Sequence, residues 1–181
     1  LIHDDVMDRD DFRRGEPAFH RHYTTLLEKE EVREPRRTGE SLAVCAGDIA
    51  FFLAGESVSA AALPEPRGAE VRRLFFRESL LVGIGQMDDV RLGARSAPAV
   101  IDEILPVYRY KTARYTFSMP LILGAAAAGG DIALRDRLDA AGEKIGTLFQ
   151  IKDDELGLFG EEADIGKPTG SDIREGKKTI L

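Results

Sequence analysis

The amino-acid sequence predicts an all-α domain, and three observations support this prediction. Most of the 181 residues lie in long segments whose apolar residues recur every three or four positions, which is the period of an amphipathic helix. Runs of alternating β-branched residues are scarce, so few strands are expected. Clusters of Pro and Gly separate the periodic segments and mark the connections between helices.

We expect helices at about residues 1–11, 18–32, 39–60, 68–92, 98–113, 115–128 and 131–158. Asp131 is a suitable N-cap for the last of these helices, because its carboxylate can accept a hydrogen bond from a free backbone N–H. Pro120 lies inside an expected helix and predicts a kink there. Residues 160–178 have no apolar period and are rich in Gly, Pro, Lys and Asp, which is typical of a functional loop.

Length and composition indicate one soluble domain over residues 1–181. The chain has 43% hydrophobic and 31% charged residues, so its composition is not that of a disordered protein. No uninterrupted apolar run reaches the roughly 20 residues of a membrane span, and we expect no transmembrane segment. The formal net charge of −7 argues against a nucleic-acid partner, because affinity for a phosphate backbone comes from Lys and Arg.

Some individual residues carry weaker expectations. Cys45 is the single cysteine and lies in an apolar stretch, so we expect a buried small side chain in a protein of the reducing cytoplasm. His20 and His22 lack the spacing of metal ligands and are expected at the surface. Because the chain begins and ends with apolar residues, Leu1 and Leu181, we expect further helices beyond both ends.

The first candidate site is acidic. Asp4 and Asp8 are one helical turn apart and share a face, about 6 Å from each other along the helix axis. Two bare carboxylates at that distance repel by about 3 kcal/mol at an effective dielectric constant of about 20, and a divalent cation would turn this repulsion into binding. A solvated acidic face is the alternative. Two nearby arginines, Arg13 and Arg14, favour a site for a metal and a diphosphate.

These residues also carry a resemblance to a known family. The segment DDVMD at residues 4–8, followed by RRG at 13–15, resembles the first aspartate-rich motif of the trans-isoprenyl diphosphate synthase (polyprenyl synthetase) family, of the farnesyl and geranylgeranyl diphosphate synthase type. The segment FQIKDDELG at 149–157 is similar to the second aspartate-rich motif, and residues 166–179 resemble the lysine-bearing loop that follows it.

Two internal segments, GQMDD at residues 85–89 and YKTA at 110–113, also match motifs of this family in the expected order. One position departs from the pattern, because Gly157 stands where a third aspartate often occurs. Asp153 and Asp154 remain. Since Mg²⁺ usually takes only one or two protein carboxylates, the substitution is compatible with metal binding.

The resemblance implies an isoprenoid synthase helical bundle around a central cavity and a cytoplasmic homodimer. It implies a magnesium-dependent prenyltransferase with about three Mg²⁺ ions in each site. The reaction would join an allylic diphosphate (dimethylallyl, geranyl or farnesyl) to isopentenyl diphosphate, giving a longer trans-polyprenyl diphosphate and diphosphate. The residues that set product length in the family would precede Leu1.

The resemblance also assigns roles to individual residues. The implied metal ligands are Asp4, Asp5, Asp8, Asp153 and Asp154. The implied catalytic residues are Asp4, Asp8, Lys111, Thr112, Gln150 and Asp153. The implied substrate contacts are Arg13, Arg14, Gln86, Asp89, Lys111, Thr112, Phe149, Gln150, Lys167 and Lys177.

Plain structural explanations stay open for several of these residues. Lys111 is an ordinary surface lysine on spacing alone, and Gln86 and Asp89 would suit a buried hydrogen-bonded pair. On the last helix, Gly142 and Gly146 share a face with Asp153. We expect that face to line a cavity, because close packing would bury Asp153 without a partner; close helix packing by the glycines is the alternative.

Two other functions remain as alternatives. A class I terpene cyclase shares the fold and the first acidic motif, but usually carries an Asn/Ser/Glu metal triad on the later helix, where this chain has Phe149-Gln150 and Asp153-Asp154. A non-catalytic partner subunit of a prenyltransferase would keep the helices and lose metal ligands, whereas Asp4, Asp8 and Asp153 are present here.

Overall fold

The computed structural model describes residues 1–160 and 177–181. Its described helices are α1 (Ile2–Asp8), α2 (Phe19–Lys29), α3 (Pro35–Ala60), α4 (Arg67–Gly93), α5 (Ile101–Val107), η1 (Tyr108–Ser118), α6 (Met119–Ala128) and α7 (Ile132–Phe159). Two short strands, β1 (Phe12–Arg13) and β2 (Glu16–Pro17), pair antiparallel. The prediction of an all-α domain is therefore confirmed, with a small hairpin that the sequence pattern did not indicate.

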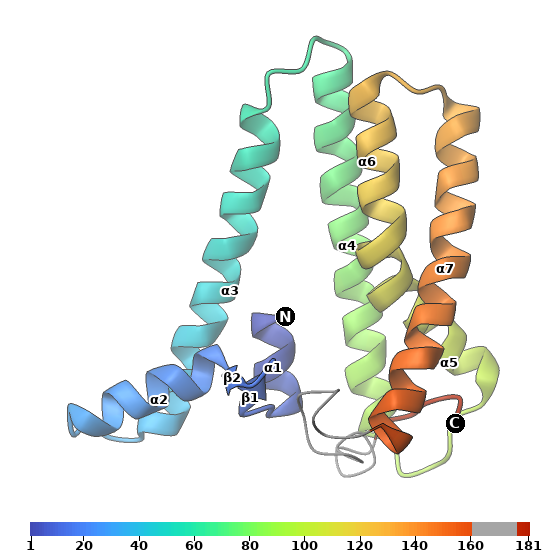
Figure 1. Ribbon diagram of the computed structural model, residues 1–181. Coiled ribbons are helices and arrows are strands. Elements are labelled where there is room, and N and C mark those ends of the chain that lie inside the picture. The colour runs from blue at the N-terminus through green and yellow to red at the C-terminus, as the bar shows by residue number, and fades with distance from the viewer. Residues whose placement is uncertain (161–176) are drawn as a thin grey trace.

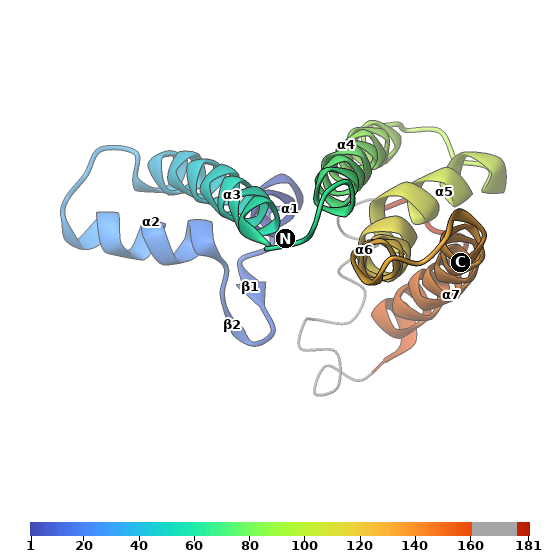
Figure 2. The same ribbon diagram turned by 90° about the horizontal axis from the view of Figure 1, so that it is seen from above.

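The long helices are arranged side by side (Figure 1), with α6 between α4 and α7. Seen from above, they form two groups, α1 to α3 with the hairpin in one and α4 to α7 in the other (Figure 2). Helix α1, the hairpin and the C-terminal residues all lie at the same end of the bundle, opposite the α3–α4 connection (Figure 1). That end brings together segments from both ends of the chain.

A π-helix replaces the break that was expected near residue 114. Helix α5, η1 and α6 run without interruption, and the backbone N–H of Met119 bonds the carbonyl of Arg114, five residues earlier. Pro120 explains the wide turn, because it has no N–H to donate and its ring clashes with the carbonyl of the preceding turn. The expected kink is thus a widened segment, and it carries the motif residues Lys111 and Thr112.

The start of α7 was correctly predicted. Asp131 is its N-cap, and one of its carboxylate oxygens accepts a hydrogen bond from the Leu134 backbone N–H at 2.7 Å. Gly129 ends α6 in the left-handed region at φ 82°, a conformation that glycine adopts without steric cost.

Helix α7 packs closely on η1 through two glycines. A Cβ atom on Gly142 would lie 2.7 Å from the Ser118 Cα, and one on Gly146 would overlap Ala113. The expectation that this stretch of α7 lines a cavity is therefore wrong, and close packing is the correct reading. Close packing of the glycines does not bury Asp153, because Asp153 lies farther along the helix and is exposed.

Buried charges join η1 to its neighbours. The Arg114 guanidinium donates to Glu78 of α4 at 2.7 Å and to Glu143 of α7 at 2.5 Å, and the side chains of Arg114 and Glu78 are only 9% and 3% exposed. Burial disfavours the charge on Arg114, but the hydrogen bond and charge of Glu78 outweigh it and raise the Arg114 pKa. This network fixes the position of η1 and hence of the motif that it carries.

Two expectations about the exposure of side chains are corrected. Cys45 is exposed. His20 is 2% exposed, not at the surface, and lies 3.5 Å from a carboxylate oxygen of Asp11. Helix α3 is long and apolar enough to cross a membrane by length and composition alone, and the core helix of a soluble protein passes the same test, so the expectation of no transmembrane segment stays a prediction.

Candidate active site

The acidic face of α1 meets lysines from two other parts of the chain. The Lys111 ammonium of η1 lies 3.1 Å from Asp4 and 2.6 Å from Asp89 of α4. The Lys177 ammonium lies 3.2 Å from Asp8. Residues from α1, α4, η1 and the C-terminal segment therefore converge, although the first and last of them are far apart in sequence.

The two carboxylates of the first motif differ in their protonation behaviour. Burial alone would raise the pKa of Asp4, but the nearby positive charge of Lys111 outweighs it and holds the pKa below its ordinary value. For Asp8, burial prevails over the opposing charge of Lys177, and the pKa is raised. The pKa of Lys111 is raised too, because Asp4 and Asp89 outweigh the effect of its burial.

Asp5 turns toward the hairpin. It is 4% exposed, and its carboxylate accepts a hydrogen bond from the Arg13 Nε at 2.8 Å, with a second one from the same guanidinium. That guanidinium also lies 3.8 Å from Asp4. Asp5 thus holds the hairpin and its arginine against the first acidic motif.

The turn of the hairpin explains the glycine of the Arg-Arg-Gly motif. Arg14 and Gly15 form a two-residue connection with φ angles of 55° and 81°, the backbone of a type I′ turn. Both positions have positive φ, which glycine tolerates best. Arg14 is held at the exposed tip as a result.

On α7 the two aspartates of the second motif point to different surroundings. Asp154 is 4% exposed, and its carboxylate accepts hydrogen bonds from the Tyr108 hydroxyl and, at 2.8 Å, from the Gln150 amide. The Gln150 carbonyl oxygen accepts from the Thr112 hydroxyl at 2.6 Å. Asp153 is exposed.

The other predicted site residues are placed as follows. Gln86 donates to the Met7 sulfur at 3.5 Å, which sets α4 against α1. The Phe149 ring is 49% exposed and packs against Phe117 with 5.4 Å between ring centroids. Lys167 lies outside the described residues.

The described residues fit a magnesium site on chemical grounds. Asp4 Oδ1 is buried and accepts no well-directed hydrogen bond, although Lys111 lies 3.1 Å away as an ion pair. Two ammonium groups lie against the two carboxylates of this face, so the face attracts cations. Carboxylate oxygens are the ligands that Mg²⁺ prefers, with water and phosphate completing its shell. In the described part of the chain no three His, Cys, Asp or Glu side chains form a metal-binding group.

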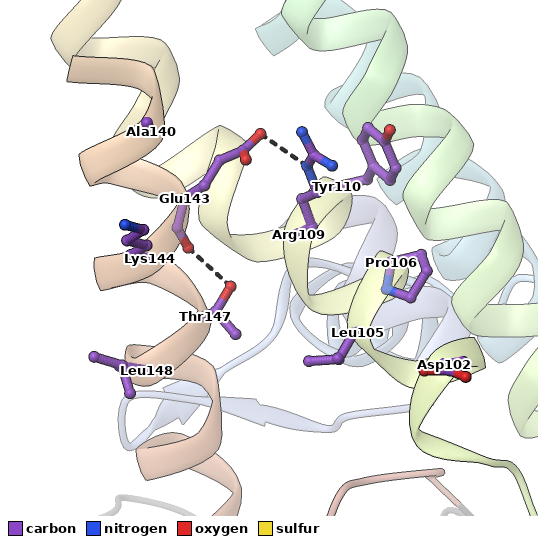
Figure 3. Close-up of a pocket in the computed structure, with 10 residues that line it drawn as sticks. All are labelled: Asp102, Leu105, Pro106, Arg109, Tyr110, Ala140, Glu143, Lys144, Thr147 and Leu148. Atoms are coloured by element: carbon purple, nitrogen blue, oxygen red, sulfur yellow. Dashed lines mark hydrogen bonds and ion pairs between the residues drawn. The ribbon is translucent and has the colours of Figure 1, made fainter. Parts of the chain in front are cut away.

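A cavity of about 810 Å³ lies away from these residues, between α7 and the α5–η1 segment. Figure 3 shows Arg109 and Glu143 pointing toward each other across it, and their side chains form an ion pair at 2.8 Å. None of the predicted site residues lines this cavity.

Sequence reasoning missed Tyr108, which contacts Asp154. A signal was present, because Tyr108 lies one helical turn before Thr112 and shares its face. It could not be recognised without knowing that α7 places Asp154 opposite, 46 residues away.

Comparison with known proteins gives concordant matches. The family model described as polyprenyl synthetase matches residues 1–181. A short chain isoprenyl diphosphate synthase of Methanocaldococcus jannaschii is 36% identical over 181 residues, which are 100% of this chain and 50% of that protein. A geranylgeranyl diphosphate synthase of Sulfolobus acidocaldarius is 36% identical over 183 residues, again 100% of this chain and 50% of that protein.

A solved structure agrees at the level of the fold. The crystal structure of geranylgeranyl pyrophosphate synthase from Corynebacterium glutamicum, complexed with isoprenyl diphosphate and magnesium, matches with a TM-score of 0.94 at 39% identity. The match covers 99% of this chain and 50% of that one. The chain spans about half the length of the curated relatives it matches. Because the family model covers every residue, the chain belongs to the polyprenyl synthetase family.

Proposed function

We propose that the protein is a magnesium-dependent prenyltransferase of isoprenoid biosynthesis, which condenses an allylic diphosphate with isopentenyl diphosphate. The observation that carries the proposal is the convergence of Asp4, Asp8, Asp89, Lys111 and Lys177 from separate segments. Such a cluster of carboxylates and ammonium groups suits a ligand that brings both cations and phosphate oxygens. Family membership and the names of the relatives point to the same reaction.

The proposed mechanism starts from an exchange of partners. Asp4 and Asp8 would hold Mg²⁺ from one side, and Asp153 would do so from α7. Lys111 and Lys177, which lie against Asp4 and Asp8 here, would turn toward phosphate oxygens. When bound, Mg²⁺ supplies Lewis acidity that makes the allylic diphosphate a better leaving group.

The remaining residues act around the reacting carbons. Arg13, which Asp5 holds beside the first motif, would contact a phosphate, and Arg14 at the hairpin tip would contact isopentenyl diphosphate. Thr112 and Gln150 would present oxygen dipoles to the allylic cation. Isopentenyl diphosphate attacks through its double bond, and the released diphosphate takes the proton, so no protein base is needed.

The test is product analysis with the whole protein, labelled isopentenyl diphosphate, Mg²⁺ and each allylic primer in turn. We expect longer prenyl diphosphates, and we expect no product when EDTA removes the metal. If farnesyl or geranylgeranyl diphosphate alone gave a hydrocarbon, the protein would be a terpene cyclase. A folded protein inactive with every primer would instead be a partner subunit.

A homodimer and a cytoplasmic location belong to the same proposal. The outward side chains of α3 support the dimer, because Ile49, Phe52 and Leu53 are 59%, 71% and 56% exposed on an apolar helix. Exposed apolar patches of this kind often mark interaction surfaces. Cys45 is compatible with a reducing compartment.

A further inference from the structure

One buried hydroxyl joins two parts of the candidate site. Tyr108 is 5% exposed at the start of η1. Its hydroxyl donates to Asp154 of α7 and accepts a hydrogen bond from the Ile180 backbone N–H at 3.1 Å. A tyrosine hydroxyl is protonated in the neutral range, so it can donate to the carboxylate and accept from the backbone at the same time.

The first set of hydrogen bonds links Asp154 to Gln150 and Thr112, which we propose face the reacting carbons. Asp154 accepts from the Gln150 amide nitrogen at 2.8 Å, which leaves the Gln150 carbonyl oxygen directed to the Thr112 hydroxyl at 2.6 Å. The amide nitrogen is the donor end of Gln150, so its hydrogen bond to Asp154 turns the carbonyl oxygen toward Thr112. The Tyr108 hydroxyl helps to hold that carboxylate in place.

The second set of contacts involves the C-terminal segment, residues 177–181. The Ile180 side chain packs against a buried apolar cluster that contains Tyr108, Leu92, Ile104 and Val107. Three residues earlier, Lys177 reaches Asp8 at 3.2 Å. A backbone anchor at Ile180 therefore restricts where the Lys177 ammonium can lie.

We propose that Tyr108 is a positioning residue with two roles. Through Asp154 it orients the Gln150–Thr112 pair, and through the Ile180 backbone it restricts the position of Lys177. The inference rests on the proposed function, because it concerns how that site is assembled. Its structural part is independent of catalysis: residues 177–181 are anchored by the Tyr108 hydroxyl, and removing that hydroxyl loosens them.

The test compares Tyr108→Phe with the unchanged whole protein by amide hydrogen exchange, without substrate or metal. Phenylalanine keeps the ring in the apolar cluster and removes the hydroxyl alone. Exchange of the Ile180 amide should become about tenfold faster, the effect of losing one buried acceptor. Tyr115→Phe is the matched control, because it makes the same change in η1 on a ring that is 49% exposed, and it should leave this exchange unaltered.

A second variant covers the case in which Tyr108→Phe does not fold. Ile180→Pro removes the donor of the same hydrogen bond and leaves Tyr108 in place. We expect it to raise the exchange of the Thr179 and Leu181 amides about tenfold. A folded Tyr108→Phe protein with unchanged exchange in residues 177–181 would overturn the proposal, and so would an Ile180→Pro protein with unchanged exchange.

Steady-state kinetics separate this role from a general effect on folding. In Tyr108→Phe we expect kcat to fall about tenfold or more, because Gln150 and Thr112 face charge that develops during the reaction. Tyr115→Phe should keep its kcat. An unchanged kcat in Tyr108→Phe would show that Tyr108 does not position the Gln150–Thr112 pair for catalysis. If neither protein catalyses prenyl transfer, the proposed function fails, while the exchange experiment still decides the anchoring.

Discussion

At the scale of single residues, Lys111 is central to the site because it neutralises two carboxylates at once. Its ammonium lies 2.6 Å from Asp89 and 3.1 Å from Asp4, and all three side chains are about a fifth to a quarter exposed. In such partly buried surroundings a charge pair is stronger than in water, and an unpaired charge is costly. The lysine therefore favours the ionised form of Asp4, the form that the proposed metal site requires.

Lys111→Met is expected to lower kcat about a hundredfold or more, because it removes the cation that we propose binds the leaving diphosphate. The pKa of Asp4 should also rise, since Lys111 is what lowers it. Steady-state kinetics of the whole enzyme measure the first effect. Lys152→Met is the matched control, because Lys152 forms an exposed pair with Glu155 within the second motif and has no role in the proposed mechanism. Equal activity of the two variants would contradict the role given to Lys111.

At the scale of the elements, the contact between α7 and η1 depends on the absence of side chains. Gly146→Ala would press a methyl group into Ala113, and we expect it to lower the free energy of unfolding by about 1–3 kcal/mol. Gly124→Ala on α6 meets nothing within 4 Å and should raise it by about 0.5–1 kcal/mol. Denaturant unfolding measures both changes. If both substitutions changed the free energy of unfolding in the same direction, the helices would not pack as closely as described.

The buried ion network gives a second prediction at this scale. Glu78→Gln leaves Arg114 with less compensation for its burial, and we expect a loss of about 3–5 kcal/mol in the free energy of unfolding. Glu155→Gln serves as the control, because it breaks an exposed pair that contributes at most about 1 kcal/mol. Similar losses in both variants would argue against a special role for the network.

Two glutamates near the starts of α4 and α5 make the stability of the protein depend on pH. Glu65 accepts hydrogen bonds from Arg72 and the Ala69 N–H, and Glu103 from Arg95 and the Val100 N–H; these bonds lower the pKa of both carboxyl groups. A carboxyl group with a lowered pKa in the folded state stabilises the protein above its unfolded-state pKa, and the stabilisation is lost as the pH falls through the folded-state pKa. The thermal midpoint of Glu65→Gln/Glu103→Gln should therefore lie below that of the unchanged protein at pH 7, and the difference should vanish in acid. A difference that persisted at low pH would contradict this assignment.

At the scale of the whole molecule, the long helices were predictable because each repeats an apolar period over many turns. The hairpin was missed because two-residue strands are too short for any alternation to be seen. The π-helix was missed because its i→i+5 bonds leave no mark in an apolar pattern. The motif residues were found, but the adjacent Asp153 and Asp154 could not be distinguished, since the inward direction of Asp154 depends on Tyr108 from another helix.

The proposed dimer is also tested at this scale. Phe52→Glu places a charge on the exposed apolar side of α3, and we expect the whole protein to shift from dimer to monomer in light scattering. Ile132→Glu, at the start of α7 with 68% exposure, is the control that should leave the mass unchanged. An unchanged mass for Phe52→Glu would place the contact between subunits on another surface.

The central claim is that the acidic face of α1 binds magnesium together with a diphosphate. Calorimetric titration of the whole protein with inorganic diphosphate, with Mg²⁺ or with EDTA, tests it most directly. We expect binding only with Mg²⁺ and its loss in Asp4→Asn/Asp8→Asn, while the exposed-site control Asp102→Asn/Asp136→Asn binds normally. Undiminished, magnesium-dependent binding in the folded Asp4→Asn/Asp8→Asn variant would contradict the account.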